Sequence, residues 1–320
     1  MNRTTPTSYV LEVIATDDNF DEPGYLALNP DVAAAVKSGD FKSGREHFLH
    51  FGRSEGRHQR WPTIIAEAKA QKLSRLRPLL RADMPFIDSR GALDFLTEEL
   101  RAEFNIVDSD AVSSNGYDQY AVDLIEKHHD GLVLDCGAGR RGVYFENVVN
   151  FEIVAYDTTD VRGVGEALPF IDESFDAVFS LAVLEHVKDP FQCAKEIVRV
   201  LKRGGDLMCC APFLQPLHGY PHHYYNMSHQ GLRNLFDSYL EIDKVECYSS
   251  VLPIWSLTWI LNAWAGGLSE ETRRDFLNMR VSDLVGSPEG YLERPFVKEL
   301  SFDKNLELAS ATVLFAHKPV

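Results

Sequence analysis

The chain has 320 residues, of which 45% are hydrophobic and 25% are charged, and its formal net charge is −16. This composition excludes a disordered, collagen-like or disulfide-stapled chain, and it allows two domains or one large domain with an appendage. The acidic excess also argues against a general nucleic-acid binder, because phosphate contacts require clustered Lys and Arg.

Five cysteines are present and no two form a C-x-x-C pair, which favours reduced thiols: Cys136, Cys193, Cys209, Cys210 and Cys247. The first ten residues contain no apolar segment of the kind that directs export. The longest apolar stretch, 251–264, is shorter than the roughly 20 residues that a membrane-spanning helix requires. We therefore expect a cytoplasmic protein.

Residues 20–60 are predicted to form a small helical module. Pro30 and Asp31 open an Ala-rich helix, and Gly39 lies just beyond its end. A second helix is expected over 45–51, closed by Gly52. The pattern YLALNPDV…HFLHFG resembles a short helical module of bacterial surface and polysaccharide-related proteins, and this resemblance implies nothing about chemistry.

Residues 61–110 are predicted to be a helical connector, beginning with one helix over 61–83 that is interrupted at Pro78. The polar side of this helix is expected to carry four cations: Lys69, Lys72, Arg75 and Arg77. They fit a solvated helix face or, alternatively, a basic amphipathic helix in peripheral contact with a membrane surface.

From residue 132 onward, apolar runs alternate with helical segments, a pattern typical of an α/β protein with a parallel sheet. Strands are expected at LVLDC, EIVAYD, DAVFSL and DLMCCAPF, and two later strands at 240–248 and 306–317. Residues 249–300 form an insertion before the last strand. Its three tryptophans, Trp255, Trp259 and Trp264, fit either core packing or a groove for a lipid-linked or glycan acceptor.

The strongest chemical signal is a glycine turn after the first of these strands. Asp135 closes the strand, and Gly137, Ala138 and Gly139 come next, which lets a ligand approach the backbone closely. Asp157 closes the next expected strand, 152–157. A carboxylate at that place is well positioned to accept hydrogen bonds from two ribose hydroxyls.

Four further motifs occur in order, namely EALPF at 166–170, SFDAVFS at 174–180, LEHV at 184–187 and LKRGG at 201–205. Together with the glycine turn, this series resembles the class I S-adenosylmethionine-dependent methyltransferases, in their type 11-like subgroup, over about residues 130–212. The resemblance implies a Rossmann-like α/β fold whose mostly parallel seven-stranded sheet has helices on both faces. It also implies a methyltransferase domain over 111–320 and S-adenosylmethionine as the cofactor.

The resemblance assigns residues of this chain to the parts of that cofactor. The methionine end would be lined by Asp135, Gly137, Ala138 and Gly139, and the ribose would be held by Asp157. The adenine would be bordered by Gly165, Glu166 and Leu168, and the sulfonium would lie above Ser180 and Leu181. His186 occupies a place where the family usually has histidine, and we expect it to be structural rather than catalytic.

Two departures from the family pattern are visible. Arg140-Arg141-Gly142 stands where a third turn glycine is often found, so two cations lie beside the turn, either solvated or in contact with a carboxylate of the cofactor or acceptor. Val164 stands where the family often has an acid that contacts the adenine amine. Adenine recognition would therefore depend on backbone groups.

The acceptor is expected beside residues 212–226, which come after the fifth strand. His218, His222 and His223 are candidate general bases, because a hydroxyl acceptor must lose a proton. The alternative is an aromatic loop packed over the sheet edge with its histidines bonded to the backbone. No ligand spacing supports a metal site. Upstream, Tyr117 and Tyr120 are candidate lid residues or, alternatively, capping and packing residues.

These features predict an S-adenosylmethionine-dependent methyltransferase with a small-molecule or saccharide acceptor. A nicotinamide-dependent oxidoreductase stays open as an alternative, because Gly137, Gly139 and Gly142 satisfy the G-x-G-x-x-G spacing. A non-catalytic scaffold with the methyltransferase fold is the other alternative. The acidic charge disfavours a nucleic-acid partner, and the sequence predicts no particular oligomeric state.

Overall fold

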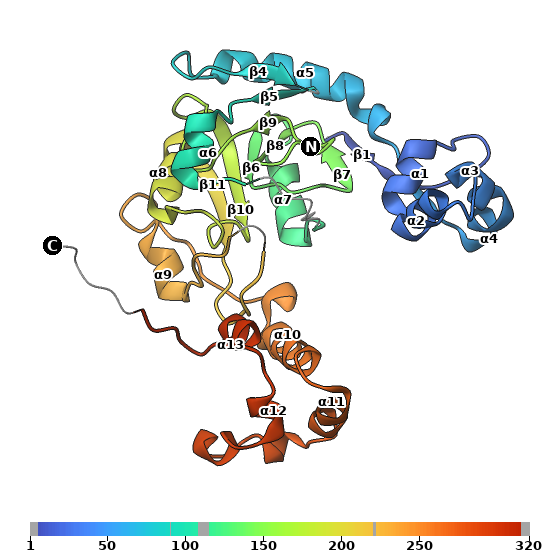
Figure 1. Ribbon diagram of the computed structural model, residues 1–320. Helices are drawn as coiled ribbons and strands as arrows, with labels where there is room; N and C mark the ends of the chain where they lie inside the picture. The colour runs from blue at the N-terminus through green and yellow to red at the C-terminus, as the bar shows by residue number, and fades with distance from the viewer. Residues whose placement is uncertain (1–5, 90, 108–114, 220–221, 315–320) are drawn as a thin grey trace. The chain divides into compact units, whose positions relative to one another are not determined.

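The computed structural model describes residues 6–89, 91–107, 115–219 and 222–314 (Figure 1). The chain divides into two compact units, Met1–Cys210 and Ala211–Val320. Within the described ranges, no helix combines the length and apolar character needed to cross a membrane.

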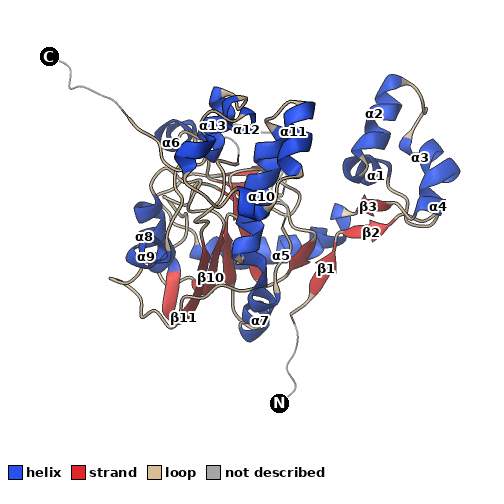
Figure 2. Cartoon of the chain, turned by 90° about the horizontal axis from the view of Figure 1, so that it is seen from below, coloured by secondary structure: helices blue, strands red, loops and turns tan. Residues whose placement is uncertain are grey.

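Near the start of the first unit, a two-stranded ribbon carries a group of short helices (Figure 2). In the ribbon, β2 (Glu12–Ile14) pairs antiparallel with β3 (His58–Arg60). The helical segments between these strands are α1 (Glu22–Leu28), α2 (Pro30–Ser38), α3 (Gly44–His47), η1 (Phe48–Gly52) and α4 (Arg53–Glu55). Their shared core contains Ala15, Tyr25, Val32 and Phe48.

The predicted limits of the first helix in this module are confirmed, since α2 begins at Pro30 and Gly39 comes directly after it with φ of 90°. The predicted end of the second helix at Gly52 is wrong. The chain continues through the π turn η1 and through α4 to Gly56, which has φ of 63°. Gly52 is required for packing instead, because a Cβ there would collide with the Tyr25 hydroxyl.

The predicted connector helix is present in three pieces, η2 (Pro62–Ile65), α5 (Ala66–Leu76) and η3 (Arg77–Leu79). The expectation that Lys69 and Lys72 lie on a polar outer side is wrong, because both are buried. Lys72 Nζ lies 3.0 Å from Asp160 Oδ2 and 3.6 Å from the centre of the Tyr144 ring, and burial lowers the pKa of Lys72 to about 8. These two lysines therefore anchor α5 to the fold.

A seven-stranded, mostly parallel sheet forms the centre of the first unit, as predicted (Figure 1). The strands in spatial order are β11 (Leu201–Cys210), β10 (Phe175–Leu181), β6 (Val133–Cys136), β8 (Val148–Glu152), β9 (Val161–Arg162), β5 (Ala92–Asp94) and β4 (Ile87–Ser89). Every neighbouring pair is parallel except β4 with β5.

Helices cover both faces of this sheet, as predicted. On one face α7 (Gln119–Lys127) packs Ala121 and Ile125 against β6, β8 and β10. On the other face Cys193 of α8 (Pro190–Val200) contacts Cys136, whose side chain points away from that of Val133 because strand side chains alternate. A third helix, α6 (Glu98–Phe104), lies between β5 and α7 in the chain.

The expected alternation of strand and helix is confirmed only between β10 and β11. Residues 137–147, between β6 and β8, contain the short strand β7 (Val143–Phe145) and no helix. β7 pairs antiparallel with β1 (Ser8–Val10), so the start of the chain lies beside the connection where a crossover helix was expected.

The second sheet strand lies earlier in the sequence than predicted. β8 ends at Glu152, so the expected strand over 152–157 is wrong and Asp157 lies in the loop after β8. The register explains the choice: Val148 and Phe151 of β8 are buried opposite Val133 and Cys136 of β6, whereas Ala155 is exposed.

Two strands come from the predicted connector, because β5 pairs parallel with β9 and β4 pairs with β5. The later strands expected at 240–248 and 306–317 are wrong. Residues 240–248 have no strand partner, residues 306–308 belong to a helix, and residues 309–314 have no regular structure. Residues 315–317 lie outside the described part of the chain.

The second unit is built from short helices around a small core of its own. They are α9 (His229–Asn234), η4 (Ser249–Val251), α10 (Pro253–Gly266), α11 (Glu270–Leu277), η5 (Val281–Asp283), η6 (Pro288–Tyr291), α12 (Pro295–Lys298) and α13 (Phe302–Leu308). The expected Trp-containing helix is α10. Only Trp264 packs into the core with Phe276 and Phe296, whereas Trp255 is 60% exposed.

Candidate functional site

The candidate site lies where β6, β8 and β10 end. These strands are parallel neighbours, so their carboxyl ends lie along one edge of the sheet, which is where open α/β sheets bind ligands. Asp135, Glu152 and Leu181 lie at these three ends. The sequence motif and the neighbouring strand ends therefore meet at the same edge.

The glycine turn has the close backbone packing that its sequence predicts. Gly137 and Gly139 have φ of 88° and 63°, a region that glycine adopts without strain. The N–H groups of Gly137 and Ala138 both donate to the carbonyl of Phe151 on β8. A Cβ at Gly137 would collide with Val183, so the loop after β10 packs directly on the turn.

Asp135 is fully buried, and its two carboxylate oxygens differ. Oδ2 accepts hydrogen bonds from Arg141 Nη2 at 2.6 Å and from the Tyr117 hydroxyl at 2.5 Å. Oδ1 has no hydrogen-bond partner among the described residues. A buried carboxylate oxygen without a donor is costly, so this atom marks a place for a ligand donor.

The two arginines that replace a third turn glycine have different environments. Arg141 is buried, pairs with Asp135 and lies 4.1 Å from the Tyr117 ring centre. Arg140 is half-buried, and burial together with the nearby Arg60 cation lowers its pKa. Tyr117 is held under the turn, and burial together with the charge of Asp135 raises its pKa. Tyr120 is largely exposed on α7.

Glu152, at the end of β8, is the residue that the sequence interpretation missed. Its Oε2 accepts a hydrogen bond from Gly139 N–H at 2.7 Å, and its Oε1 accepts one from Ile153 N–H at 2.8 Å. Burial raises the pKa of this carboxyl despite these donors. An acid that closes the strand beside the glycine turn fits the place predicted for a ribose-binding carboxylate.

Asp157, to which the resemblance assigned the ribose, lies five residues after β8. Both of its oxygens accept hydrogen bonds from Arg60, at 2.5 and 2.6 Å. Its carboxylate therefore already has a bidentate partner that comes from β3.

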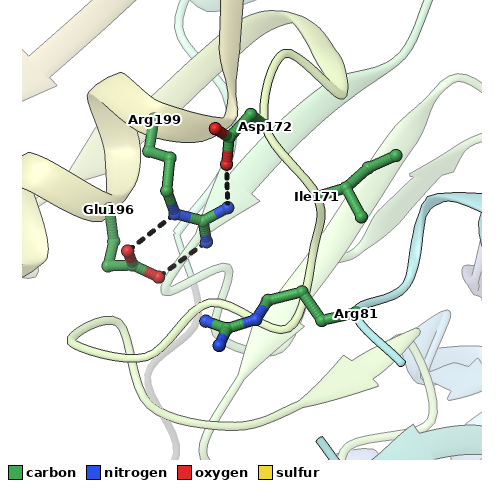
Figure 3. A pocket seen from close by; sticks show the side chains of 5 residues that line it. All are labelled: Arg81, Ile171, Asp172, Glu196 and Arg199. Carbon is green, nitrogen blue, oxygen red and sulfur yellow. Dashed lines mark hydrogen bonds and ion pairs between the residues drawn. The ribbon is translucent and has the colours of Figure 1, made fainter. Parts of the chain in front are cut away.

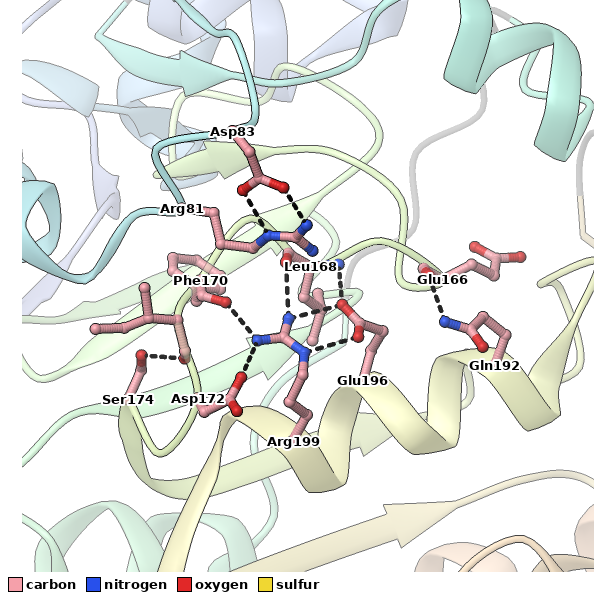
Figure 4. A network of polar contacts seen from close by, with 11 residues as sticks. Arg81, Asp83, Glu166, Leu168, Phe170, Asp172, Ser174, Gln192, Glu196 and Arg199 are labelled. Carbon is pink, nitrogen blue, oxygen red and sulfur yellow. Dashed lines mark hydrogen bonds and ion pairs between the residues drawn. The ribbon is translucent and has the colours of Figure 1, made fainter.

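The segment predicted to border an adenine is fixed by α8 and the loop before it (Figure 4). Glu166 accepts a hydrogen bond from Lys188 N–H, and burial raises the pKa of Glu166. Leu168 N–H donates to Glu196, and Arg199 donates to the carbonyl of Leu168. Behind this segment, Gly165 approaches Cys193 so closely that a Cβ would collide with its thiol.

A pocket of about 470 Å³ lies beside this network, lined by Arg81, Ile171, Asp172, Glu196 and Arg199 (Figure 3). Arg199 is paired with Glu196 and Asp172, and Arg81 is paired with Asp83. The charges are thus compensated within the protein. The pocket contains none of the residues predicted to bind a cofactor.

The end of β10 carries strained backbone and a buried acid. Ser180 is fully buried, and Ala182, just after Leu181, has φ of 57°, a conformation that costs a residue with a Cβ free energy. Glu185 is buried, and burial raises its pKa to about 7. His186 Nε2 lies 3.7 Å from Glu185 Oε1.

The three candidate bases lie in the second unit and differ in their hydrogen bonds. His223 Nδ1 accepts from the His218 backbone N–H, so its Nε2 carries the proton and donates to Asn226. His218 Nδ1 lies 2.9 Å from the Pro216 carbonyl, which makes Nε2 the basic nitrogen of the neutral ring. The His222 ring lies 5.2 Å from the Tyr224 ring. Of His218 and His223, His218 has the tautomer that suits a base.

Comparison with known proteins finds one matching family and several partial relatives. Residues 134–209 match the family described as "Methyltransferase domain". An uncharacterized methyltransferase of Mycobacterium avium is 50% identical over 54 residues, which are 17% of this chain and 21% of the relative. One from Mycobacterium tuberculosis is 51% identical over 45 residues, 14% of this chain and 18% of the relative. The chain therefore spans about a fifth of the length of the curated relatives it matches.

Solved structures give similar but more distant matches. A SAM-dependent methyltransferase of Thermotoga maritima, described as a possible histamine N-methyltransferase, has 22% identity and a TM-score of 0.27, covering 34% of this chain and 62% of that one. A putative methyltransferase of Bacillus halodurans has 21% identity and a TM-score of 0.29, covering 37% and 66%. Residues 134–209 of this chain therefore match a methyltransferase domain, in agreement with the prediction from the sequence motifs.

Proposed function

We propose that this protein transfers a methyl group from S-adenosylmethionine to a small-molecule or saccharide acceptor. The observation that carries the proposal is the pair of carboxylates at neighbouring strand ends. Asp135 has a buried oxygen without a donor among the described residues, and Glu152 is hydrogen-bonded to the glycine turn. An ammonium group and a ribose diol are donors of the kind that these two carboxylates would accept.

Named residues would hold the cofactor along the strand ends. Asp135 Oδ1 would accept from the methionine ammonium, and the open backbone of Gly137, Ala138 and Gly139 would border the methionine end. Glu152 would take the ribose hydroxyls in place of Asp157, whose carboxylate pairs with Arg60. When bound, S-adenosylmethionine supplies an electrophilic methyl group on a sulfonium.

Adenine would be bordered by Gly165, Glu166 and Leu168, and Ser180 and Leu181 would lie beneath the sulfonium. Glu166 is itself held by Lys188 N–H, and Leu168 by α8, so the segment is pre-organised. Pre-organisation matters because methyl transfer depends mainly on alignment of donor and acceptor. Where the acceptor is a hydroxyl, His218 is our candidate to take its proton.

The nicotinamide-dependent alternative is disfavoured by the structure of the segment after the glycines. A dinucleotide-binding G-x-G-x-x-G loop opens a helix whose N-terminus holds the pyrophosphate. Here Gly142 leads into the strand β7, and residues 137–147 contain no helix. The scaffold alternative stays open until turnover is measured.

We also propose a cellular compartment and an acceptor charge for this protein. All five cysteines are free thiols, which suits a reducing compartment such as the bacterial cytoplasm. The net charge of −16 favours a neutral acceptor over a polyanion such as RNA.

Turnover tests the proposal. The protein would be incubated with labelled S-adenosylmethionine and fractionated small-molecule and glycan extracts, and released S-adenosylhomocysteine would be measured by mass spectrometry. We expect release with the wild type in at least one fraction and none with Asp135→Asn. Binding of S-adenosylmethionine without release in any fraction would favour the scaffold, and binding of a nicotinamide cofactor instead would overturn the proposal.

A further inference from the structure

Arg60 is the largest fully buried side chain among the described residues, and it joins three separate segments of the first unit. Nε and Nη2 donate to the two oxygens of Asp157 in the loop after β8. Nη1 donates to Glu12, which lies directly opposite Arg60 in the ribbon of β2 and β3. Nη2 also donates to the backbone carbonyl of Arg141 at 2.8 Å.

The contact with Arg141 connects Arg60 to the glycine turn. The backbone carbonyl of Arg141 is held by Arg60, while its guanidinium holds Asp135. The next carbonyl, that of Gly142, accepts from Leu11 N–H at 2.9 Å. The turn that starts at Gly137 is thus tied at its far end by residues from the first 60 positions.

The position of Arg60 is itself set by the helical module. Gly24 of α1 lies so close that a Cβ there would collide with the Arg60 carbonyl. The side chain of Arg60 is planar and donates in fixed directions, which allows a carboxylate and a carbonyl to be held at once. A lysine at this place would keep the charge and lose this geometry.

We propose that Arg60 is a positioning residue for the cofactor turn, so that residues 8–60 complete the methyltransferase site. This inference rests on the proposed function. Arg60 fixes the path of residues 139–142, which places the Arg141 guanidinium on Asp135 Oδ2 and leaves Oδ1 for the cofactor. The role of Asp157 is then to hold Arg60.

Two variants of Arg60 and one matched control test this role. Arg60→Ala removes the contact, and Arg60→Lys keeps the charge without the bidentate geometry. Lys72→Met removes another buried cation, which joins α5 to Asp160 and to the Val148 carbonyl of β8 without contact to the turn. Each would be titrated with S-adenosylhomocysteine in a calorimeter, and unliganded samples would be followed by hydrogen exchange over residues 137–143.

We expect at least a tenfold loss of affinity in Arg60→Ala, a smaller loss of several-fold in Arg60→Lys, and less than about a twofold change in Lys72→Met. Amide hydrogen exchange over residues 137–143 should be faster than in the wild type in both Arg60 variants and unchanged in Lys72→Met. Folded Arg60 variants with wild-type affinity and exchange would overturn the inference. If Arg60→Ala does not fold, Arg60→Lys decides on the same criteria. Absence of binding by the wild type would instead refute the proposed function.

Discussion

Glu185 gives a prediction that depends only on the structure. Its carboxyl lies in the loop that follows β10 and is fully buried, and neither oxygen has a hydrogen-bond partner among the described residues. Burial raises its pKa from 4.5 to about 7. The native state therefore binds this proton more tightly than the unfolded chain, so the contribution of Glu185 to stability is fully present below pH 4.5 and is lost as the pH rises to about 7.

The size of the effect is given by the same pKa values. One unit of pKa corresponds to about 1.36 kcal/mol, so the contribution of Glu185 to the free energy of unfolding falls by on the order of 3 kcal/mol across this interval. Glu185→Gln keeps the shape and removes the titration. We expect the stability of Glu185→Gln relative to wild type to grow by up to that amount between pH 4.5 and 8, measured by urea unfolding.

Glu98→Gln, at an exposed position on α6 in the same unit, is the matched control for removing a carboxyl that is not buried. A difference between Glu185→Gln and wild type that does not change with pH would refute the reasoning, because it would mean that the buried carboxyl is ionised without penalty.

Three further predictions concern the turn, α5 and the histidines. Gly137→Ala should lower the free energy of unfolding by about 2–3 kcal/mol in a urea titration, because it adds a collision with Val183 to the cost of positive φ. The control Gly56→Ala, at a position with φ of 63° and open space around it, should lower the free energy of unfolding by about 1 kcal/mol. Lys72→Met should lower the free energy of unfolding by about 3 kcal/mol, because it leaves Asp160 buried without its cation. The double variant Lys72→Met/Asp160→Asn should recover part of that loss in thermal unfolding. His218→Asn should lower kcat by about a hundredfold or more with a hydroxyl acceptor, whereas His223→Ala should mainly lower the melting temperature. Equal effects of the two substitutions on kcat would contradict the tautomer assignment.

The central strands were predictable because their apolar runs are bounded by strong turn signals. Val133–Cys136 ends at the glycine turn, and Phe175–Leu181 contains a run of buried residues over 177–180. The run 148–157 is ambiguous by contrast, because VVNFE and EIVAYD are both apolar segments of strand length. Only the register against β6 selects the first of them, and with it Glu152 as the acid at the strand end.

Outside the central strands, the presence of a strand depends on whether a neighbouring strand pairs with it. Residues 240–248 alternate apolar and polar side chains as a strand would, yet no described strand lies beside them. The hairpin of β4 and β5 has strands of only three residues, too short for periodicity to be visible, although Gly91 marks its turn with φ of 75°. Short strands and strand partners depend on tertiary contacts that a single sequence does not display.

The site residues show the same division between local and tertiary information. The glycine turn and Asp135 are local features, and they were predicted. The cations Lys72 and Arg60 are buried against carboxylates about 90 positions later in the chain, and their sequence neighbours give no sign of it. Polar residues far apart in sequence are matched only by the fold.

Calorimetric titration of the wild type with S-adenosylhomocysteine, compared with Glu152→Gln, tests the central claim most directly. We predict saturable one-site binding by the wild type and at least tenfold weaker binding by the variant, because a ribose diol would lose a charged acceptor. Absence of binding by the folded wild type, or equal affinities in the two proteins, would contradict the account.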